Sequence, residues 1–391
     1  MNKLYSFLLL LFVTCQSSFG QEKIQLDLAA EYRKGIAFMQ ANQYEKAVDH
    51  IFECQRADPN DLSYALKLAY CYTKLGNYKD AKYSYQSVLQ RDSLNINALT
   101  NLGGVYEKEY NYQTAQKYYL RLLEIDSTNS YFYKQNGFIA VKNNQILAAI
   151  GYFSEAHRYN PKDLVAISEL SKLYLRVEAV AIADEIIERG YQQDSTNLKT
   201  LYAKADIKRV QKKYPEIITT IERAMVQGDT VLYYQKMLAS AYLQTEAYDE
   251  SLFHLNRIIS KRQASEYTHY HMAVALAAQG KLEESIKHYD LAIELGISEN
   301  ISVYYKNLAK LYVDTKELSA AITAYKEAYE YSGKPEHLFQ IARNSDLYYK
   351  DKKIALRYYK KYLATKHEAY RKYAKERITQ LKEIIHFQVK S

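Results

Sequence analysis

The chain has 391 residues, of which 48% are hydrophobic and 25% charged, and its formal net charge is +8. With 12 glycines and 4 prolines, it has too few turn-forming residues for a loop-rich β-sandwich, a collagen or a disordered linker protein. Three cysteines exclude a disulfide scaffold. The 42 tyrosines and 11 phenylalanines exclude a disordered chain, because so many aromatic rings require a large interior to pack against.

Residues 1–20 have the pattern of a secretory signal peptide: a basic Lys3, an apolar run over residues 4–13, and small residues at Ser18 and Gly20. We expect cleavage after Gly20, which leaves residues 21–27 as a short N-terminal lead. The apolar run is about half as long as a membrane-spanning helix needs to be. The sequence therefore favours export to the periplasm or cell envelope. Lipidation at Cys15 and a retained membrane anchor are the alternatives.

From Gly35 onward a small residue recurs every 34 positions, and repeats of this length indicate a chain built from stacked structural units. The first series is Gly35, Ala69, Gly103, Gly137, Ser171, Ala205, Ala239 and Ala273. The second series, twelve positions later, is Ala47, Ala81, Ala115, Ala149, Ala183, Ile217, Ser251 and Ser285. The third series, aromatic or aliphatic, is Tyr44, Tyr78, Tyr112, Ile146, Val180, Tyr214, Tyr248 and Leu282. Two less regular copies follow at Ala309/Ala321 and Ala342/Ala355.

Each repeat is predicted to hold two short amphipathic helices. In the third repeat, Leu99, Leu102, Gly103 and Tyr106 have the i, i+3, i+4, i+7 spacing of one helical face. A helix of this length is about 20 Å long and cannot bury its own apolar side. Two antiparallel helices cover one side of each other, and the neighbouring repeat covers the other. Turn-forming clusters such as Asp58-Pro59-Asn60 separate the repeats, where they end one helix and cap the next.

This pattern resembles the tetratricopeptide repeat family. The resemblance rests on Leu102-Gly103, Tyr106, Ala115, Tyr119 and Leu122 in the third repeat, and on Gly137, Ala149, Phe153, Ala156 and Pro161 in the fourth. It implies an all-α, right-handed superhelical solenoid of about ten antiparallel helix pairs over residues 28–365, with a C-terminal capping helix and tail over 366–391. The tryptophan typical of the family is absent, and Leu99, Tyr133, Ile167 and Leu201 stand in its place.

The sixth repeat departs most from the family pattern. Lys208 stands where Tyr106 stands in the third repeat, Ile217 replaces a small residue, and Pro215 lies close before it. We expect either a loose joint or a change of packing angle at this repeat, and the sequence leaves both open.

No motif for catalysis, phosphate binding or metal binding occurs, so we expect a protein that is not an enzyme and holds no cofactor or metal. His269 and His271 lie two apart, point in different directions on a helix, and are predicted to be surface histidines. Cys54 and Cys71 are predicted to lie on helices that pack together. A disulfide is possible there after export, and two small buried thiols are the alternative.

In the family, the first helix of each pair lines a concave inner wall, and the resemblance places candidate partner-binding residues there. The candidates are Tyr131, Lys134, Lys142, Lys172, Arg176, Tyr202, Arg209, Tyr233, Lys236, Tyr267, Tyr270, Lys306 and Lys310. Lysines beside rigid tyrosines suit an extended or acidic protein segment. The family's chaperone-tail clamp is not predicted, because Tyr32 and Ile36 occupy the places of its Lys and Asn. A solvated wall without a dedicated ligand is the alternative.

The positive charge is concentrated near the C-terminus. Residues 343–382 contain thirteen Lys or Arg and four Asp or Glu, a local charge of +9. The favoured hypothesis is a non-enzymatic protein–protein interaction scaffold of the bacterial cell envelope, similar to exported repeat proteins of Bacteroidetes-type bacteria. The alternative is an envelope-associated module that binds anionic lipid or polysaccharide through the basic C-terminal end. Neither hypothesis predicts a small-molecule substrate or a nucleic acid as partner.

Overall fold

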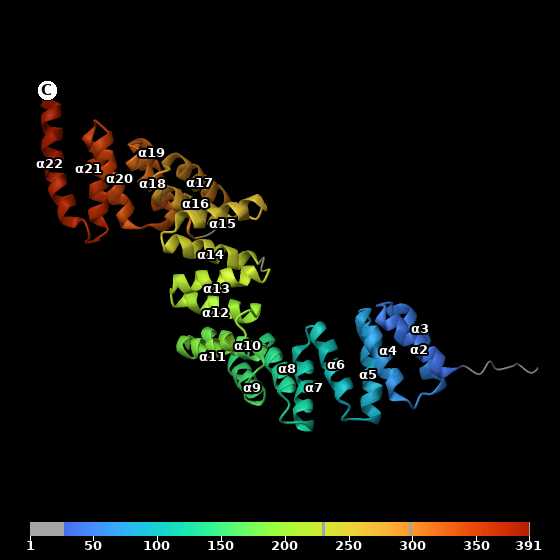
Figure 1. Ribbon diagram of the computed structural model, residues 1–391. Coiled ribbons are helices and arrows are strands. Elements are labelled where there is room, and N and C mark those ends of the chain that lie inside the picture. Colours follow the sequence, from blue (N-terminus) through green and yellow to red (C-terminus); the bar gives the residue numbers. More distant parts are fainter. Residues whose placement is uncertain (1–26, 229–230, 297–298, 391) are drawn as a thin grey trace, which may run out of the picture. The chain divides into compact units, whose positions relative to one another are not determined.

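The structure is a computed structural model that describes residues 27–228, 231–296 and 299–390, with the backbone alone at 388–390. In this part of the chain every regular element is an α-helix (Figure 1). The predicted signal peptide, Cys15 and most of the 21–27 lead lie outside the described residues. The helices divide into two units, residues 27–166 and 167–390, which are described separately.

The first unit is a file of antiparallel helix pairs, in which short turns join the two helices of a pair and each pair packs on the next. The third series explains where the second helix of each pair begins, because it supplies the first residue of that helix. Its helices are α2 (Leu28–Gln40), α3 (Tyr44–Ala57), α4 (Leu62–Lys74), α5 (Tyr78–Arg91), α6 (Ile96–Lys108), α7 (Tyr112–Ile125), α8 (Ser130–Lys142) and α9 (Ile146–Tyr159).

The second unit repeats the same arrangement and ends in one longer helix. Helix α10 (Leu164–Arg176) begins in the first unit and continues into the second. The others are α11 (Val180–Gln193), α12 (Leu198–Val210), α13 (Tyr214–Val226), α14 (Leu232–Gln244), α15 (Tyr248–Ser260), α16 (Glu266–Ala278), α17 (Leu282–Leu295), α18 (Ile301–Asp314), α19 (Leu318–Ser332), α20 (Pro335–Tyr348), α21 (Lys352–Ala364) and α22 (Arg371–Lys390). The predicted all-α solenoid of helix pairs is thereby confirmed.

At glycines of the first series, side chains of the partner helix approach the backbone closely. A Cβ atom added at Gly137 would lie 2.7 Å from ring carbon Cε2 of Phe153 on the partner helix, and one at Gly35 would lie 2.6 Å from Cγ1 of Ile51. Phe153 and Ile51 are fully buried. Only a small residue therefore leaves room for the bulky side chain that seals each pair.

The turn inside each pair requires a left-handed backbone at one fixed place. Positive φ angles recur every 34 residues, at Asn42, Gly76, Tyr110, Asn144, Glu178, Lys212, Glu246 and Gly280. Most of these residues are not glycine, although a side chain disfavours this conformation by about 1 kcal/mol. The packing of the two helices therefore determines the turn, and the residue at the turn adapts to it.

The sixth repeat is held by charge at a position where most of the other repeats carry an aromatic ring. The Lys208 side chain is 3% exposed, and its Nζ lies 2.7 Å from Asp184 and 3.1 Å from Glu216. Burial favours a higher pKa for the Asp184 carboxyl, but hydrogen bonds from Lys208 and Gln211 outweigh it and lower that pKa. An ion-pair cluster that joins α11, α12 and α13 thus fills the place of the missing ring.

Helix α22 packs against α21 and is tied to α20 by a buried carboxylate. The Asp346 side chain is 8% exposed and accepts hydrogen bonds from Nε and Nη2 of Arg377, at 2.6 and 3.2 Å. On the same helix Ala374 and Leu381 have no exposed surface and join the last core cluster.

No described helix is both long enough and apolar enough to cross a membrane.

The possible disulfide between Cys54 and Cys71 is not formed, since both are free thiols without exposed surface. The Cys54 thiol donates to the carbonyl oxygen of Leu28 at 3.7 Å, and Cys71 packs in the core cluster that contains Ile51 and Leu68. Burial raises the pKa of Cys71 to about 11. The two cysteines therefore act as small buried residues, which was the alternative left open by the sequence.

We expect Gly137→Ala to destabilise the protein, because Phe153 must shift to admit the new methyl group. Overpacking costs about 1–3 kcal/mol and outweighs the gain of about 1 kcal/mol that alanine brings to a helix. Gly151→Ala is the matched control: Gly151 lies in the middle of α9 with no atom within 4 Å of its added Cβ, so this variant gains stability. Urea midpoints measure both, and equal stabilisation by the two substitutions would contradict the close approach.

We expect Lys208→Met to cost about 2 kcal/mol at pH 7, because it leaves Asp184 partly buried without its cation. Folding lowers the pKa values of Asp184 and Glu216 below the 3.8 and 4.5 that are usual for these carboxyl groups, because Lys208 donates hydrogen bonds to both. The ionised carboxylates therefore contribute their full stabilisation of the folded protein above these usual pKa values. This stabilisation is lost as the pH falls through the lower pKa values of the folded state. The difference in free energy of unfolding between the wild type and the Lys208→Met variant should therefore become smaller when the pH is lowered to 3.

Urea midpoints at pH 7 and pH 3 measure this difference. Lys213→Met is the control, because Lys213 is 48% exposed and its Nζ lies 3.5 Å from Glu216, a pair worth less than about 1 kcal/mol. A Lys208→Met defect of the same size at both pH values would show that lost packing, and not lost charge, causes it.

Candidate protein-binding pocket

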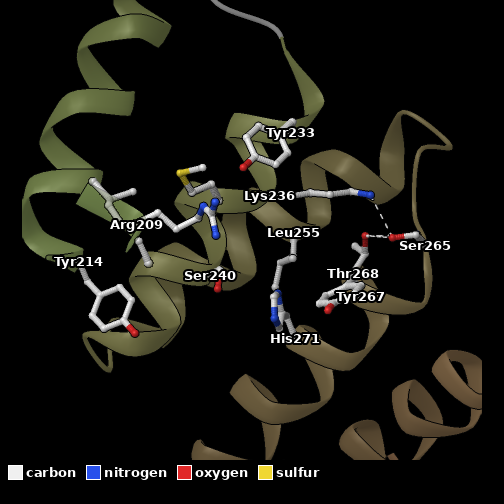
Figure 2. Close-up of a pocket in the computed structure, with 13 residues that line it drawn as sticks. Arg209, Tyr214, Tyr233, Lys236, Ser240, Leu255, Ser265, Tyr267, Thr268 and His271 are labelled. Atoms are coloured by element: carbon white, nitrogen blue, oxygen red, sulfur yellow. Dashed lines mark hydrogen bonds between the residues drawn. The ribbon is translucent and has the colours of Figure 1, made fainter. Parts of the chain in front are cut away.

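Four of the thirteen candidate partner-binding residues line one cavity in the second unit, formed by helices α12 to α16 (Figure 2). The cavity has a volume of about 480 Å³, which is large enough for one or two amino-acid side chains. The predicted residues among its walls are Arg209, Tyr233, Lys236 and Tyr267. The other lining residues are Tyr214, Ile217, Met237, Ser240, Ala241, Leu255, Ser265, Thr268 and His271.

Helix periodicity explains how the walls of this pocket form. Tyr233, Met237 and Ser240 lie at i, i+4 and i+7 on α14 and therefore share one face. Tyr267 and His271 have the same four-residue spacing on α16. The side chains of Met237 and Leu255 are buried and give the pocket an apolar floor. The rings of Tyr233 and Tyr267 are 50% and 48% exposed.

The pocket is positively charged and no carboxylate lines it. Lys236 Nζ donates to the hydroxyl of Ser265 at 3.0 Å, as Figure 2 shows, so its hydrogen-bond partner is neutral. Ser265 in turn is the N-cap of α16, in a capping box with Thr268. Among the described residues, neither Lys236 nor Arg209 lies within 4.0 Å of a carboxylate. Both cations are thus available to an anionic group of a ligand.

One carboxylate lies close to Arg209, but tyrosine hydroxyls already engage it. Tyr233 and Tyr234 donate to the two carboxylate oxygens of Asp206, at 3.2 and 3.1 Å. Burial raises the pKa of Asp206 and outweighs these hydrogen bonds. The ring of Tyr202 stacks on that of Tyr234 with centroids 4.1 Å apart. This arrangement fixes the position of Tyr233 at the pocket rim.

The two histidines of α16 are not the surface residues that the sequence predicted. Burial, with the nearby charge of Lys236, lowers the pKa of His271 to about 4, so this pocket residue is neutral at pH 7. His269 is 8% exposed, and its Nδ1 lies 2.9 Å from Nδ1 of His288 on α17. His269 turns inward because the pairing of α16 with α17 covers its side of the helix, whereas His271 lies on the other side of α16 and lines the pocket.

The remaining candidates lie outside the pocket, and several are used in packing. Lys134 forms an ion pair of 2.5 Å with Asp163, and Lys172 one of 3.0 Å with Glu169. Tyr270 packs on Tyr304, with ring centroids 4.9 Å apart. Lys306 is half-buried near Lys310 and Lys334; burial and these two charges lower its pKa. The candidates exposed elsewhere on their units are Tyr131, Lys142, Arg176 and Lys310.

Sequence reasoning missed the apolar floor of the pocket, Met237 and Leu255. It also missed the hydroxyl groups of Ser240, Ser265 and Thr268 in the walls. The i, i+4, i+7 spacing of Tyr233, Met237 and Ser240 was the available signal, but the same spacing occurs on most helices of the chain. The first unit also has a hollow, of about 620 Å³, and Lys67 is its one charged lining residue among those described. No group of three or more metal-ligating side chains occurs in the described ranges.

Comparison with known proteins gives one consistent family. Tetratricopeptide repeat models match residues 64–93, 98–130 and 265–332. Similar solved structures include a tetratricopeptide repeat protein of Parabacteroides merdae (15% identity, 64% of this chain and 98% of that chain, TM-score 0.46). They also include pilF of Pseudomonas aeruginosa (19% identity, 55% and 97%, TM-score 0.46). A third is YrrB, described as a TPR protein with an unusual peptide-binding site (17% identity, 47% and 94%, TM-score 0.42).

No curated protein matches the chain. The matched segments lie in both units, and each covers helix pairs with the small-residue and aromatic series described above. The chain is therefore a tetratricopeptide repeat protein.

Proposed function

We propose that this protein is a non-enzymatic protein–protein interaction scaffold of the bacterial cell envelope, and that the pocket between α12 and α16 holds a segment of its partner. Tetratricopeptide repeat proteins typically bind other proteins or peptides, which supports the general role. The signal-peptide pattern of residues 1–20 supports the export of the chain. The proposal assigns no cofactor and no small-molecule substrate to the protein.

The observation that carries the proposal is the combination of charges and apolar groups in the pocket. Arg209 and Lys236 are cations without a carboxylate partner, and they flank a floor made by Met237 and Leu255. This combination fits a partner segment with an acidic group beside an apolar side chain. The acidic group forms charge-assisted hydrogen bonds while the apolar side chain leaves water.

The exposed tyrosines at the rim suit the same role. Tyrosine offers a broad ring and a hydroxyl while it loses little conformational entropy on binding. Asp206 and Tyr234 hold the Tyr233 ring in place before a ligand arrives. A prearranged ring lowers the entropic cost of association.

We expect the double variant Arg209→Gln and Lys236→Gln to bind acidic, leucine- or phenylalanine-containing peptides at least about tenfold more weakly, since hydrogen bonds to charged groups are worth about 1.5–3 kcal/mol each. Fluorescence anisotropy with a panel of labelled acidic, neutral and basic peptides measures the affinities. The matched control is Lys306→Gln with Lys310→Gln, which removes the same charge from the same unit outside the pocket.

The proposed site is wrong if the two double variants lose affinity for acidic peptides to the same extent, because the loss would then come from net charge. It is also wrong if the wild-type protein prefers basic peptides. The envelope assignment has its own test: fractionation of the native host should recover the mature chain, beginning at Gln21, with the periplasm or the envelope. Recovery of the uncleaved chain from the cytoplasm would contradict that assignment.

A further inference from the structure

Helix α21 differs from every other second helix of a described pair. Helices α3, α5, α7, α9, α11, α13, α15, α17 and α19 each contain at least one Asp or Glu. Helix α21 contains none, and it has five cations, Lys352, Lys353, Arg357, Lys360 and Lys361. Cations four positions apart on a helix repel each other and destabilise it. Stability therefore does not explain this pattern.

Four of the five cations point away from the core. Ala355, Tyr359 and Tyr362 form the inward face of α21 and have no exposed surface. Lys352 lies at the edge of that face, with its Nζ 3.5 Å from Asp346. The other four cations are exposed and line a shallow groove of about 460 Å³ with Leu356 and Ala364.

The groove contains no carboxylate, and no ion pair within the described part of the chain neutralises its cations. Lys353, Arg357, Lys360 and Lys361 have no Asp or Glu oxygen within 4.0 Å. The half-buried ring of Tyr358 lies between two of them, 5.3 Å from Arg357 and 5.5 Å from Lys361. These cation–π contacts keep two of the charges at neighbouring positions.

The shape and charge of this groove select a class of ligand. Lys353 and Lys361 are eight residues apart, or about 12 Å along a helix, so four charges fall within the length of a few monomers of a linear polymer. All the lining residues lie on α21, so the face is an open strip one helix wide, and it has no exposed aromatic or large apolar side chain to insert into a bilayer. Its one ring, that of Tyr358, is half-buried and already contacts Arg357 and Lys361, so it gives nucleic-acid bases no open surface on which to stack.

We propose that the outer face of α21 binds an anionic polysaccharide, a chain whose carboxylate or sulfate groups lie along the row of Lys353, Arg357, Lys360 and Lys361. The site is separate from the α12–α16 pocket and shares no residue with it. The protein would thereby be held on acidic glycan while the pocket remains open to its protein partner.

The test measures binding of the full mature chain to polygalacturonate, which is carboxylated, and to heparin, which is sulfated, by biolayer interferometry at 25 and 300 mM NaCl. We expect binding to at least one of them at low salt and a steep loss at high salt, because the contacts are ionic. Neutral dextran should not bind. The polymer that binds more tightly identifies the anionic group.

The decisive variant replaces Lys353, Arg357, Lys360 and Lys361 with Gln. We expect it to bind at least about 100-fold more weakly at 25 mM NaCl, since each Lys or Arg near an anionic surface strengthens binding about fivefold. The matched control is Lys46→Gln, Lys79→Gln, Lys117→Gln and Lys287→Gln, which removes the same charge from exposed positions on four other second helices. It should retain binding within a factor of about three. Circular dichroism melting checks that both variants fold.

Three results would overturn the proposal. The first is that neither acidic polymer binds. The second is an equal loss in the two quadruple variants, which would mean that net charge alone is responsible. The third is tighter binding of phosphatidylglycerol vesicles or single-stranded DNA than of both polysaccharides, with the same loss in the α21 variant, which would assign the face to lipid or to nucleic acid. Peptide binding to the α12–α16 pocket should be unchanged in the α21 variant, so the two proposals fail independently.

Discussion

The close approach of two short helices at a small residue is the contact on which each repeat depends. A thirteen- or fourteen-residue helix such as α8 or α9 is marginal in water by itself, because nucleation is costly and one face stays apolar. When Gly137 lets Phe153 reach the opposite backbone, the pair buries that face. Where serine replaces alanine on the second helix, a hydrogen bond is added: Ser251 donates to the carbonyl of Ala239, and Ser285 to that of Ala273. Stability then passes from each pair to its neighbours.

The distribution of charge gives this chain its individual character within the repeat architecture. Several charges that the packing buries are paired, as Lys208 is with Asp184 and Asp346 with Arg377. The cations that line the α12–α16 pocket and the outer face of α21 have no such partners among the described residues. The pocket combines its charge with an apolar floor and rings, which suits a protein segment. The α21 face has charge alone, which suits a polyanion. One scaffold thus presents two surfaces of different chemistry.

Much of the fold could be predicted because its determinants are local and repeated. The third series supplies the first residue of the second helices from Tyr44 to Leu282, and glycines of the first series lie where an added Cβ atom would clash with the partner helix. The recurrent left-handed turn was not predicted, because residues as different as Tyr110, Glu178 and Gly280 occupy it. The candidate site was predicted only in part. Arg209, Tyr233, Lys236 and Tyr267 meet in one pocket, whereas Lys134 is paired with Asp163 and Tyr270 is packed against Tyr304.

The sequence by itself determined the unit that repeats, its two helices and the positions that must be small, because periodicity within 34 residues specifies which side of each helix is apolar. Only the tertiary structure decided which polar side chains pair with other side chains of the protein and which remain available to a ligand. Asp163 meets Lys134 from 29 positions away, and His288 meets His269 from 19. Such partners come from a neighbouring helix, and the direction in which each side chain points depends on how closely the two helices pack.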